Sequence, residues 1–378
     1  MIRTKPLAAA LGAAALSLIA SFGAARADDV TIGMIASMTG VAAAYDRAVV
    51  EGAEACIKLW NAEGGFKGRR VALEVLDDES VPTTAVNVYR KLVDDKRIKV
   101  IFAAAPGQTM LSIKAVADDY GVPAIGSSTT VQLAKPVAKY FFRSLPGTDA
   151  YMDALVAWAK RRGYGRIATL NPIDSGGQGE AYELKRAAAA QHLVVVAAET
   201  YSNTDTNFIA QLVNIRNARP DFLYLGTIGG PTVTIFKQAK QLHLAMPIAI
   251  HSSAFNNNFF AGIGGRDKAE GVYTPVERGG LGSNAPGIAG KLYADASRLL
   301  GHPATNLNTA GWDTAMLIRH AYETSDGTRT GTRDAIENTR DLPVIGGFIS
   351  YTPTDHGGKD ARDVVVAQWH DGHFVSAN

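Results

Sequence analysis

Short apolar runs alternate with longer segments of helical spacing in the first part of the chain. The alternation predicts four strands, at residues 30–35, 71–76, 100–104 and 122–125, and three helices between them, at residues 45–61, 82–95 and 108–120. Strands that alternate with helices pair in parallel, because each crossover helix returns the chain to the same edge of the sheet. We therefore expect a parallel sheet with helices on both faces.

The same alternation begins again after Pro146. It predicts helices at residues 149–162, 179–190, 207–218 and 232–242, and strands at residues 167–170, 193–198, 222–226 and 247–251. Two series of this kind in one chain predict two α/β lobes.

The last hundred residues have a less regular pattern. Residues 271–277 are extended, residues 288–300 and 309–323 have helical spacing, and the apolar segments 347–351 and 364–369 have the character of antiparallel strands. The pair Asp371-Gly372 predicts a tight turn near the end.

The first 27 residues have the pattern of a secretory signal peptide. Arg3 and Lys5 precede an uncharged stretch rich in Ala and Leu, and Ala25-Arg26-Ala27 supplies the small residues of a cleavage site. The strongly apolar part is shorter than the roughly 20 residues that span a bilayer, which argues against a membrane anchor. We expect export, cleavage after Ala27, and a mature protein that is soluble because Asp28, not a lipid-bearing cysteine, follows the cut.

The composition is that of an ordinary globular protein, with 378 residues of which 47% are hydrophobic and 20% charged. This length favours two compact lobes over one. The formal charge of +2 becomes −1 when the three basic residues of the signal segment are removed, which gives no reason to expect nucleic acid or an anionic membrane as partner.

Signatures of catalysis are missing from the sequence. There is no phosphate-binding loop, dinucleotide fingerprint, zinc-protease motif or nucleophile elbow. Cys56 is the only cysteine, and its apolar neighbours favour a buried, inert thiol. The acidic run at residues 77–79 has no nearby His or Cys to complete a metal site, so we expect it to end a strand and cap the next helix. No enzyme activity, cofactor or metal is predicted.

Five blocks near the start of the mature chain resemble the opening of the type I periplasmic binding proteins of the Leu/Ile/Val-binding family, the extracytoplasmic receptors of ABC importers. The blocks are residues 32–40, Tyr45, and residues 51–55, 61–69 and 77–78. The similarity continues through residues 121–123, 142–143, 219–222, 270–272 and 312–315, and so covers nearly the whole mature chain.

The resemblance implies two doubly wound α/β lobes joined by three hinge crossovers, which close on a ligand held between them. We place the crossovers near Ser144, Thr274 and Ser350, which gives an N-terminal lobe of residues 28–144 and 275–350 and a C-terminal lobe of residues 145–274 and 351–378. It also implies a periplasmic monomer that delivers a small carboxylate ligand to ABC permease subunits in the inner membrane.

The family's first lobe binds a ligand carboxylate with hydroxyl and backbone N–H groups that follow the third and fourth strands. The matching candidates here are Pro106, Gly107 and Gln108 in one loop and Ser128, Thr129 and Thr130 in the next. Tyr45 matches an aromatic residue that contacts the ligand. The alternatives are that the Ser/Thr run only caps a helix and that Tyr45 belongs to the core.

The second lobe departs from the family pattern. Its two aromatic positions fall at Ser175 and Ile228, and the acidic residue that holds an amino group falls at Ser252. A buried ammonium needs a counter-charge. The ligand is therefore either a hydrophobic amino acid or an aromatic acid that lacks an amine. An exported enzyme or a ligand sensor on the same fold is the alternative of another class.

Overall fold

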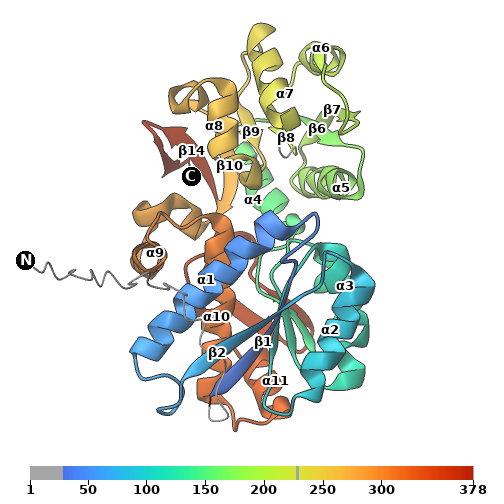
Figure 1. The fold of residues 1–378 in the computed structure, drawn as a ribbon. Helices are drawn as coiled ribbons and strands as arrows, with labels where there is room; N and C mark the ends of the chain where they lie inside the picture. The colour runs from blue at the N-terminus through green and yellow to red at the C-terminus, as the bar shows by residue number, and fades with distance from the viewer. Residues whose placement is uncertain (1–28, 227–229, 378) are drawn as a thin grey trace, which may run out of the picture.

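The computed structural model describes residues 29–226 and 230–377, and the predicted signal segment lies outside them. The described chain forms two lobes, one above the other in Figure 1, each built on its own sheet. None of the helices in these residues combines the length and the apolar character needed to cross a membrane.

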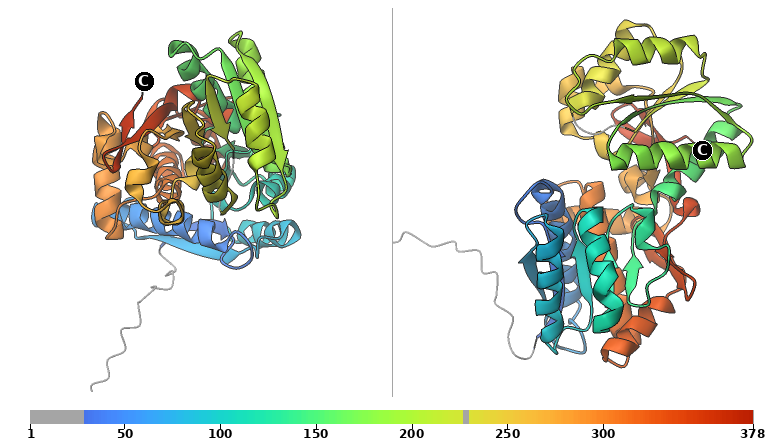
Figure 2. Two further views of the ribbon diagram at one scale, coloured as in Figure 1. Left: turned by 90° about the horizontal axis from the view of Figure 1, so that it is seen from above. Right: turned by 90° about the vertical axis from the view of Figure 1, so that its right-hand side faces the viewer.

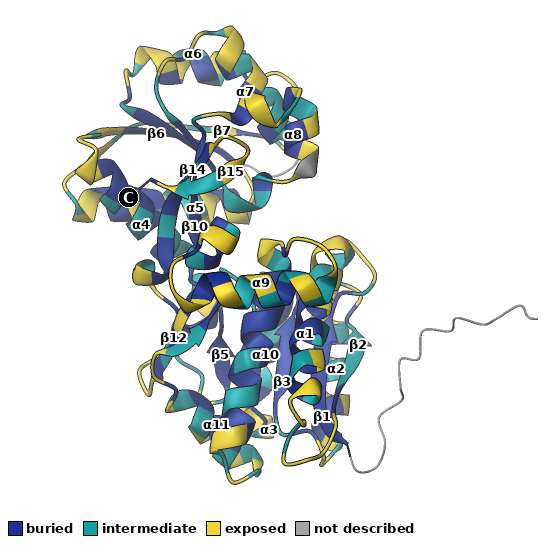
Figure 3. Cartoon of the chain, turned by 90° about the vertical axis from the view of Figure 1, so that its left-hand side faces the viewer, coloured by how far each residue is buried: buried dark blue, intermediate teal, exposed yellow. Residues whose placement is uncertain are grey.

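The first lobe contains a five-stranded parallel sheet of order β2-β1-β3-β4-β5. Its strands are β1 (Val30–Ala36), β2 (Val71–Asp77), β3 (Ile101–Ala104), β4 (Ala124–Gly126) and β5 (Phe141–Arg143). One face is covered by α1 (Ala43–Ala62), α9 (Ile288–Leu300), α10 (Asn306–Thr324) and α11 (Arg329–Glu337), and the other by α2 (Pro82–Asp94) and α3 (Gly107–Tyr120). Strands β1 and β3, in the middle of the sheet, are buried, as Figure 3 shows, whereas the edge strand β2 is mostly half-buried.

The helix ends follow from local sequence. Pro82 begins α2, where a missing N–H is tolerated, and Gly121 ends α3 with a φ of 62° that favours glycine. At the start of α10, Thr305 and Asn308 cap each other's backbone. These signals fix the lengths of the helices that carry the loops described below.

Helices α1 and α10 approach each other closely because glycine faces the partner helix on both sides. A Cβ atom at Gly52 would collide with the carbonyl oxygen of Asn308, and one at Gly311 would collide with that of Val49. The contact lets the buried polar side chain of Asn308 donate a hydrogen bond to the Ala48 carbonyl at 2.9 Å.

The second lobe contains a seven-stranded sheet of order β15-β14-β10-β9-β8-β6-β7, parallel from β10 to β7 and antiparallel at β14 and β15. Its strands are β6 (Arg166–Pro172), β7 (Val194–Tyr201), β8 (Phe222–Leu225), β9 (Ile248–Ile250), β10 (Tyr273–Glu277), β14 (Val364–His370) and β15 (His373–Ser376). One face packs on α4 (Thr148–Arg161) and α5 (Ser175–Ala190), and the other on α6 (Ile209–Asn217), α7 (Gly230–Gln241) and α8 (Asn257–Ile263). Figure 2 shows α5 on the side of this lobe that faces the first.

The predicted fold class is confirmed, and each strand and helix predicted from the pattern is present within a few residues of its expected ends. The pattern missed β5, α8, α11 and β15, which are short or strongly polar. It also missed most of a small antiparallel sheet formed by β11 (Leu342–Val344), β12 (Gly347–Thr352) and β13 (Asp355–Gly358).

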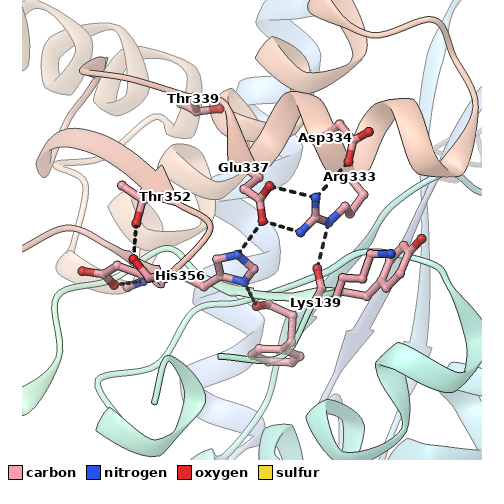
Figure 4. A network of polar contacts seen from close by, with 12 residues as sticks. Lys139, Arg333, Asp334, Glu337, Thr339, Thr352 and His356 are labelled. Carbon is pink, nitrogen blue, oxygen red and sulfur yellow. Dashed lines mark hydrogen bonds and ion pairs between the residues drawn. The ribbon is translucent and has the colours of Figure 1, made fainter. Parts of the chain in front are cut away.

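A buried histidine fastens this small sheet to the first lobe. The side chain of His356 is fully buried and stacks on Phe142, with ring centroids 4.1 Å apart. Its Nδ1 lies 2.9 Å from the Phe141 carbonyl and its Nε2 3.2 Å from Glu337, which also pairs with Arg333 (Figure 4). Strand β13 therefore packs against β5 and is part of the first lobe.

The chain passes between the two sheets three times: between β5 and α4, between β10 and α9, and between β13 and β14. The first passage begins at Ser144, directly after β5. Thr274 lies inside β10 and Ser350 inside β12, so the second passage follows Glu277 and the third follows Gly358. We propose that the lobes divide at these three passages.

Candidate functional site

The candidate site starts from two neighbouring loops of the first lobe, which follow β3 and β4. Because the carboxyl ends of parallel strands share one edge of the sheet, these loops lie side by side. The hydroxyls of Ser128 and Thr130 are 3.1 Å apart, and Thr130 Oγ1 sits against Gly107 so closely that a Cβ atom there would collide with it. The structure thus brings Gly107, Ser128 and Thr130 together, all half-buried.

The other candidates in these loops have different surroundings. Pro106 precedes the first turn of α3 as its N-cap residue, and Gln108 is exposed in that turn. The carbonyl of Thr129 accepts bonds from the backbone N–H (2.9 Å) and hydroxyl (3.2 Å) of Thr148, the first residue of α4. The Ser/Thr loop therefore lies where the lobes meet.

Tyr45 is in the first turn of α1, after the loop that follows β1, and is 43% exposed. This exposure rules out the alternative that it is a core residue. Val41, in the loop before it, is 93% exposed. An exposed ring at the carboxyl end of the sheet is free to contact a ligand, so Tyr45 stays a candidate.

The loop after β1 is held by buried carboxylates. The Ser37 backbone N–H donates to Asp46 (2.9 Å) and its hydroxyl donates to Asp78 (2.6 Å), while Asp77 accepts from the N–H of Met38 (2.9 Å). Burial raises the pKa of Asp46, and the hydrogen bonds with Ser37 lower it. The effect of burial is the larger, and the pKa is about 7. The prediction that the acidic run caps the next helix is wrong, because α2 has no side-chain cap; the carboxylates position the β1 loop instead.

In the second lobe, two predicted residues follow strand ends. Ser175 is the first residue of α5, after β6, and Ser252 is in the short 3-10 helix Ser252–Ala254, after β9. Ile228 lies outside the described residues. The glycines that follow Ser175 belong to the first turns of α5, where the N-cap residue Asp174 accepts the Gly177 N–H at 2.9 Å.

Sequence reasoning missed a carboxylate in the second lobe. Glu180, in the second turn of α5, places Oε1 3.0 Å from Nε2 of His251 and Oε2 3.3 Å from the Tyr224 hydroxyl. The side chains of Glu180 and His251 are 12% and 20% exposed. Sequence analysis found a serine, Ser252, at the position of the acidic residue. The structure places the carboxylate of Glu180, from another β-α unit, beside the neighbouring His251.

The histidine beside Glu180 is held from both sides. The Ser253 N–H donates to its Nδ1 at 3.1 Å, so Nε2 carries the proton shared with Glu180. Burial lowers the pKa of His251, but the charge and hydrogen bond of Glu180 outweigh that effect and raise it. Asn171, at the end of β6, is buried with a side-chain amide nitrogen that has no hydrogen-bond partner among the described residues.

An ion triad lies where the second and third passages meet. Lys359 is fully buried, and its Nζ is 2.7 Å from both Glu277 and Asp313. Asp313, on α10, also accepts the N–H groups of Ile345 and Gly346 at 2.8 Å. The triad ties the end of β10 and the chain after β13 to a helix of the first lobe.

The remaining titratable groups show no catalytic arrangement in the described part of the chain. Cys56 is buried as predicted, and burial raises the pKa of its thiol. Glu270, His370 and Asp371 bring their ligand atoms within 4.8 Å of one another at the turn between β14 and β15, but all three are exposed and His370 is already paired with Glu270 at 2.6 Å. This group is an ion pair at the surface.

Comparison with known proteins places these features in a family. The family model described as "Periplasmic binding protein" matches residues 29–373. A Leu/Ile/Val-binding protein of Rhizobium johnstonii is 25% identical over 359 residues, which is 92% of this chain and 94% of that protein.

Solved structures agree with the fold. A putative branched-chain amino acid ABC transporter protein from Rhodospirillum rubrum superposes with a TM-score of 0.77 at 20% identity, over 92% of this chain and 99% of that one. A branched-chain amino acid transporter substrate-binding protein from Streptococcus pneumoniae, crystallised with isoleucine, superposes with a TM-score of 0.75 at 18% identity, over 92% of this chain and 98% of that one. The family match extends along nearly the whole described chain, and the two-sheet architecture agrees with it. This chain therefore belongs to the periplasmic binding proteins.

Proposed function

We propose that this protein is the extracytoplasmic substrate-binding protein of an ABC importer, and that it binds a small carboxylate-bearing ligand, a hydrophobic amino acid or a related acid, between its two lobes. The observation that carries the proposal is the pair of hydroxyls at Ser128 and Thr130 beside Gly107.

A carboxylate needs several convergent donors when it leaves water. Hydroxyls at two positions, together with the free N–H groups at the start of α3, supply such donors from one edge of the sheet. Each charge-assisted hydrogen bond contributes roughly 1.5 to 3 kcal/mol. The first lobe therefore has the chemistry to hold a carboxylate.

The second lobe supports an amino acid over an acid without an amine. Glu180 has a carboxylate at the carboxyl ends of β8 and β9, where it can accept a ligand ammonium. The lack of a counter-charge spoke for amine-free aromatic acids, and Glu180 offers a carboxylate that could supply one. The Rhizobium relative, named for leucine, isoleucine and valine, points the same way.

The family and the predicted signal peptide support a periplasmic location and ABC permease subunits as partners. Contacts of one ligand with both lobes would favour the closed arrangement over the open one, because only differential affinity shifts such an equilibrium. We propose that the protein acts as a monomer.

Native mass spectrometry of the purified protein, followed by thermal-shift titration, tests the proposal. Leucine, isoleucine and valine should raise the melting temperature by several degrees. Their deaminated counterparts and benzoate should have much smaller effects. Stabilisation by benzoate alone would exclude the amino-acid ligand, and a bound molecule whose mass changes on incubation would identify an enzyme instead.

A further inference from the structure

A pocket lies at the third passage between the lobes, against the small antiparallel sheet. Its volume is about 320 Å³, at the lower end of the range for small-molecule sites. It is lined by Arg340 and Asp341, which precede β11, by residues of β12 and β13, by the chain from Gly358 to Asp363, and by Arg278, which follows β10. None of the residues of the candidate site above lines it.

Two guanidinium groups of this pocket lack a carboxylate partner in the described residues. Arg278 donates only to the Arg362 carbonyl, at 2.8 Å, and its Nε is buried without a partner. Arg340 donates to the carbonyls of Glu337 (2.8 Å) and Thr339 (2.9 Å). The planar fork of an arginine pairs well with a carboxylate, so these groups can take up an anionic end of a ligand.

The pocket also has carboxylates that no basic side chain neutralises by direct contact. Asp355 accepts only the Gly357 N–H, at 2.8 Å, and Asp341 accepts the Ser350 hydroxyl at 3.2 Å. Of the other charged groups in the lining, Lys359 pairs with Glu277 and Asp313, and Arg362 pairs with Asp360. Asp363 accepts the Phe348 N–H at 2.9 Å. With four basic side chains and four aspartates, the lining is formally neutral but carries unpaired charges of both signs.

An apolar surface completes the pocket. Phe348, on β12, lines it with a ring that is 43% exposed, and the buried Tyr351 lies on the same strand. A simple anion would meet the aspartates, and a simple cation the arginines. A ligand with both charges and an apolar part meets each group with its complement.

We propose that this pocket binds a small zwitterion that bears a carboxylate, an ammonium group and an apolar side chain, independently of the site between the lobes. Arg278 and Arg340 hold the carboxylate, Asp355 and Asp341 hold the ammonium, and Phe348 covers the apolar part. Because Arg278 and residues 358–363 belong to two of the three passages, a ligand here contacts the segments on which the lobes turn.

The test uses three fluorinated probes that share one ring: 4-fluorophenylalanine, 3-(4-fluorophenyl)propanoate and 4-fluorophenethylamine. Fluorine NMR titrations of the full mature chain should show saturable binding of the zwitterion, at least about fivefold tighter than that of either singly charged probe. Arg340→Gln, Arg278→Lys and Asp355→Asn should each weaken it at least about fivefold. Arg216→Gln, an exposed change on α6, is the matched control and should leave it unchanged.

The same titration on Ser128→Ala/Thr130→Ala separates this pocket from the site between the lobes. Binding that persists there and falls in the pocket variants supports the proposal. Equal binding of the three probes, no effect of the pocket variants, or loss of all binding in Ser128→Ala/Thr130→Ala would overturn it. The proposed transport function is tested with other ligands at other residues, so either can fail alone. Circular dichroism of each variant verifies that it is folded.

Discussion

Nε2 of His251, just after β9, lies 3.0 Å from Oε1 of Glu180, in the second turn of α5. The two residues come from different β-α units and meet because α5 packs on the face of the sheet from which His251 projects. This contact gives the second lobe a carboxylate that its own loop sequence, His251-Ser252-Ser253, does not contain.

Glu180→Gln should weaken binding of an amino-acid ligand by tenfold or more, about 1.4 kcal/mol, because the amide keeps the shape of the side chain but cannot neutralise an ammonium. Isothermal titration calorimetry with leucine and with its deaminated analogue measures the effect. The variant should bind the two nearly equally. An unchanged preference for leucine would remove Glu180 from the site. Glu183→Gln, one turn further along α5, is the control.

Ser128→Ala combined with Thr130→Ala should weaken ligand binding by tenfold or more without unfolding the protein. The two hydroxyls are half-buried and bonded mainly to each other, so their loss costs the ligand its donors and the fold little. Thr204→Ala, in an exposed loop of the second lobe, serves as the control. Unchanged affinity, measured by calorimetry, would show that the carboxylate lies elsewhere.

The regular part of the fold could be predicted because each buried strand and amphipathic helix has its own signature in the sequence. The small sheet β11 to β13 could not, since its position depends on distant partners such as the contact of His356 with the Phe141 carbonyl. For the same reason we propose a third passage after Gly358, later than the expected position near Ser350, because β13 contacts β5.

The site could be predicted only in part. Ser128 and Thr130 follow β4, which is the neighbour of β3 in the sheet, so the loops after these two strands adjoin. The family resemblance pointed to the same two loops. Glu180 sits in the run Gly176 to Glu180, which indicates a turn and a helix start but not which strands that helix will cross. Local spacing does not report contacts between separate β-α units.

Gly311→Ala should destabilise the protein by about 2 to 4 kcal/mol, because its methyl group would strike the Val49 carbonyl at the α1–α10 contact. Gly179→Ala, in α5, is the matched control: nothing lies within 4 Å of the added methyl, and the change should stabilise by about 0.4 to 1 kcal/mol. Urea unfolding measures both. Equal effects of the two changes would contradict the packing argument.

Lys359→Met should destabilise the protein by about 3 to 5 kcal/mol, because it leaves Glu277 and Asp313 buried without a counter-charge. Adding Glu277→Gln to the variant should recover part of the loss, since one of the two uncompensated charges disappears. Urea unfolding of both variants provides the comparison. A further loss in the double variant would show that the triad does not act through charge.

Asp46 gives the protein a pH-dependent stability with a defined sign. Its pKa is about 7 in the folded protein, against 3.8 for the free side chain, chiefly because it is buried. The folded state therefore holds this proton at pH values where the unfolded chain has lost it, so the free energy of unfolding should fall as pH rises from about 4 to 7 and then level off.

Asp46→Asn cannot ionise, yet its side-chain oxygen can still accept the Ser37 N–H. Relative to the wild type, it should gain stability across this range, by at least about 1 kcal/mol at pH 7.5. Asp78, whose pKa burial also raises and whose charge contributes to the raised pKa of Asp46, is present in both proteins. Urea unfolding at pH 4.5, 5.5, 6.5 and 7.5 measures the difference, with the exposed change Asp119→Asn as control. Parallel pH profiles for Asp46→Asn and the wild type would mean that the buried carboxylate does not hold its proton in the folded state.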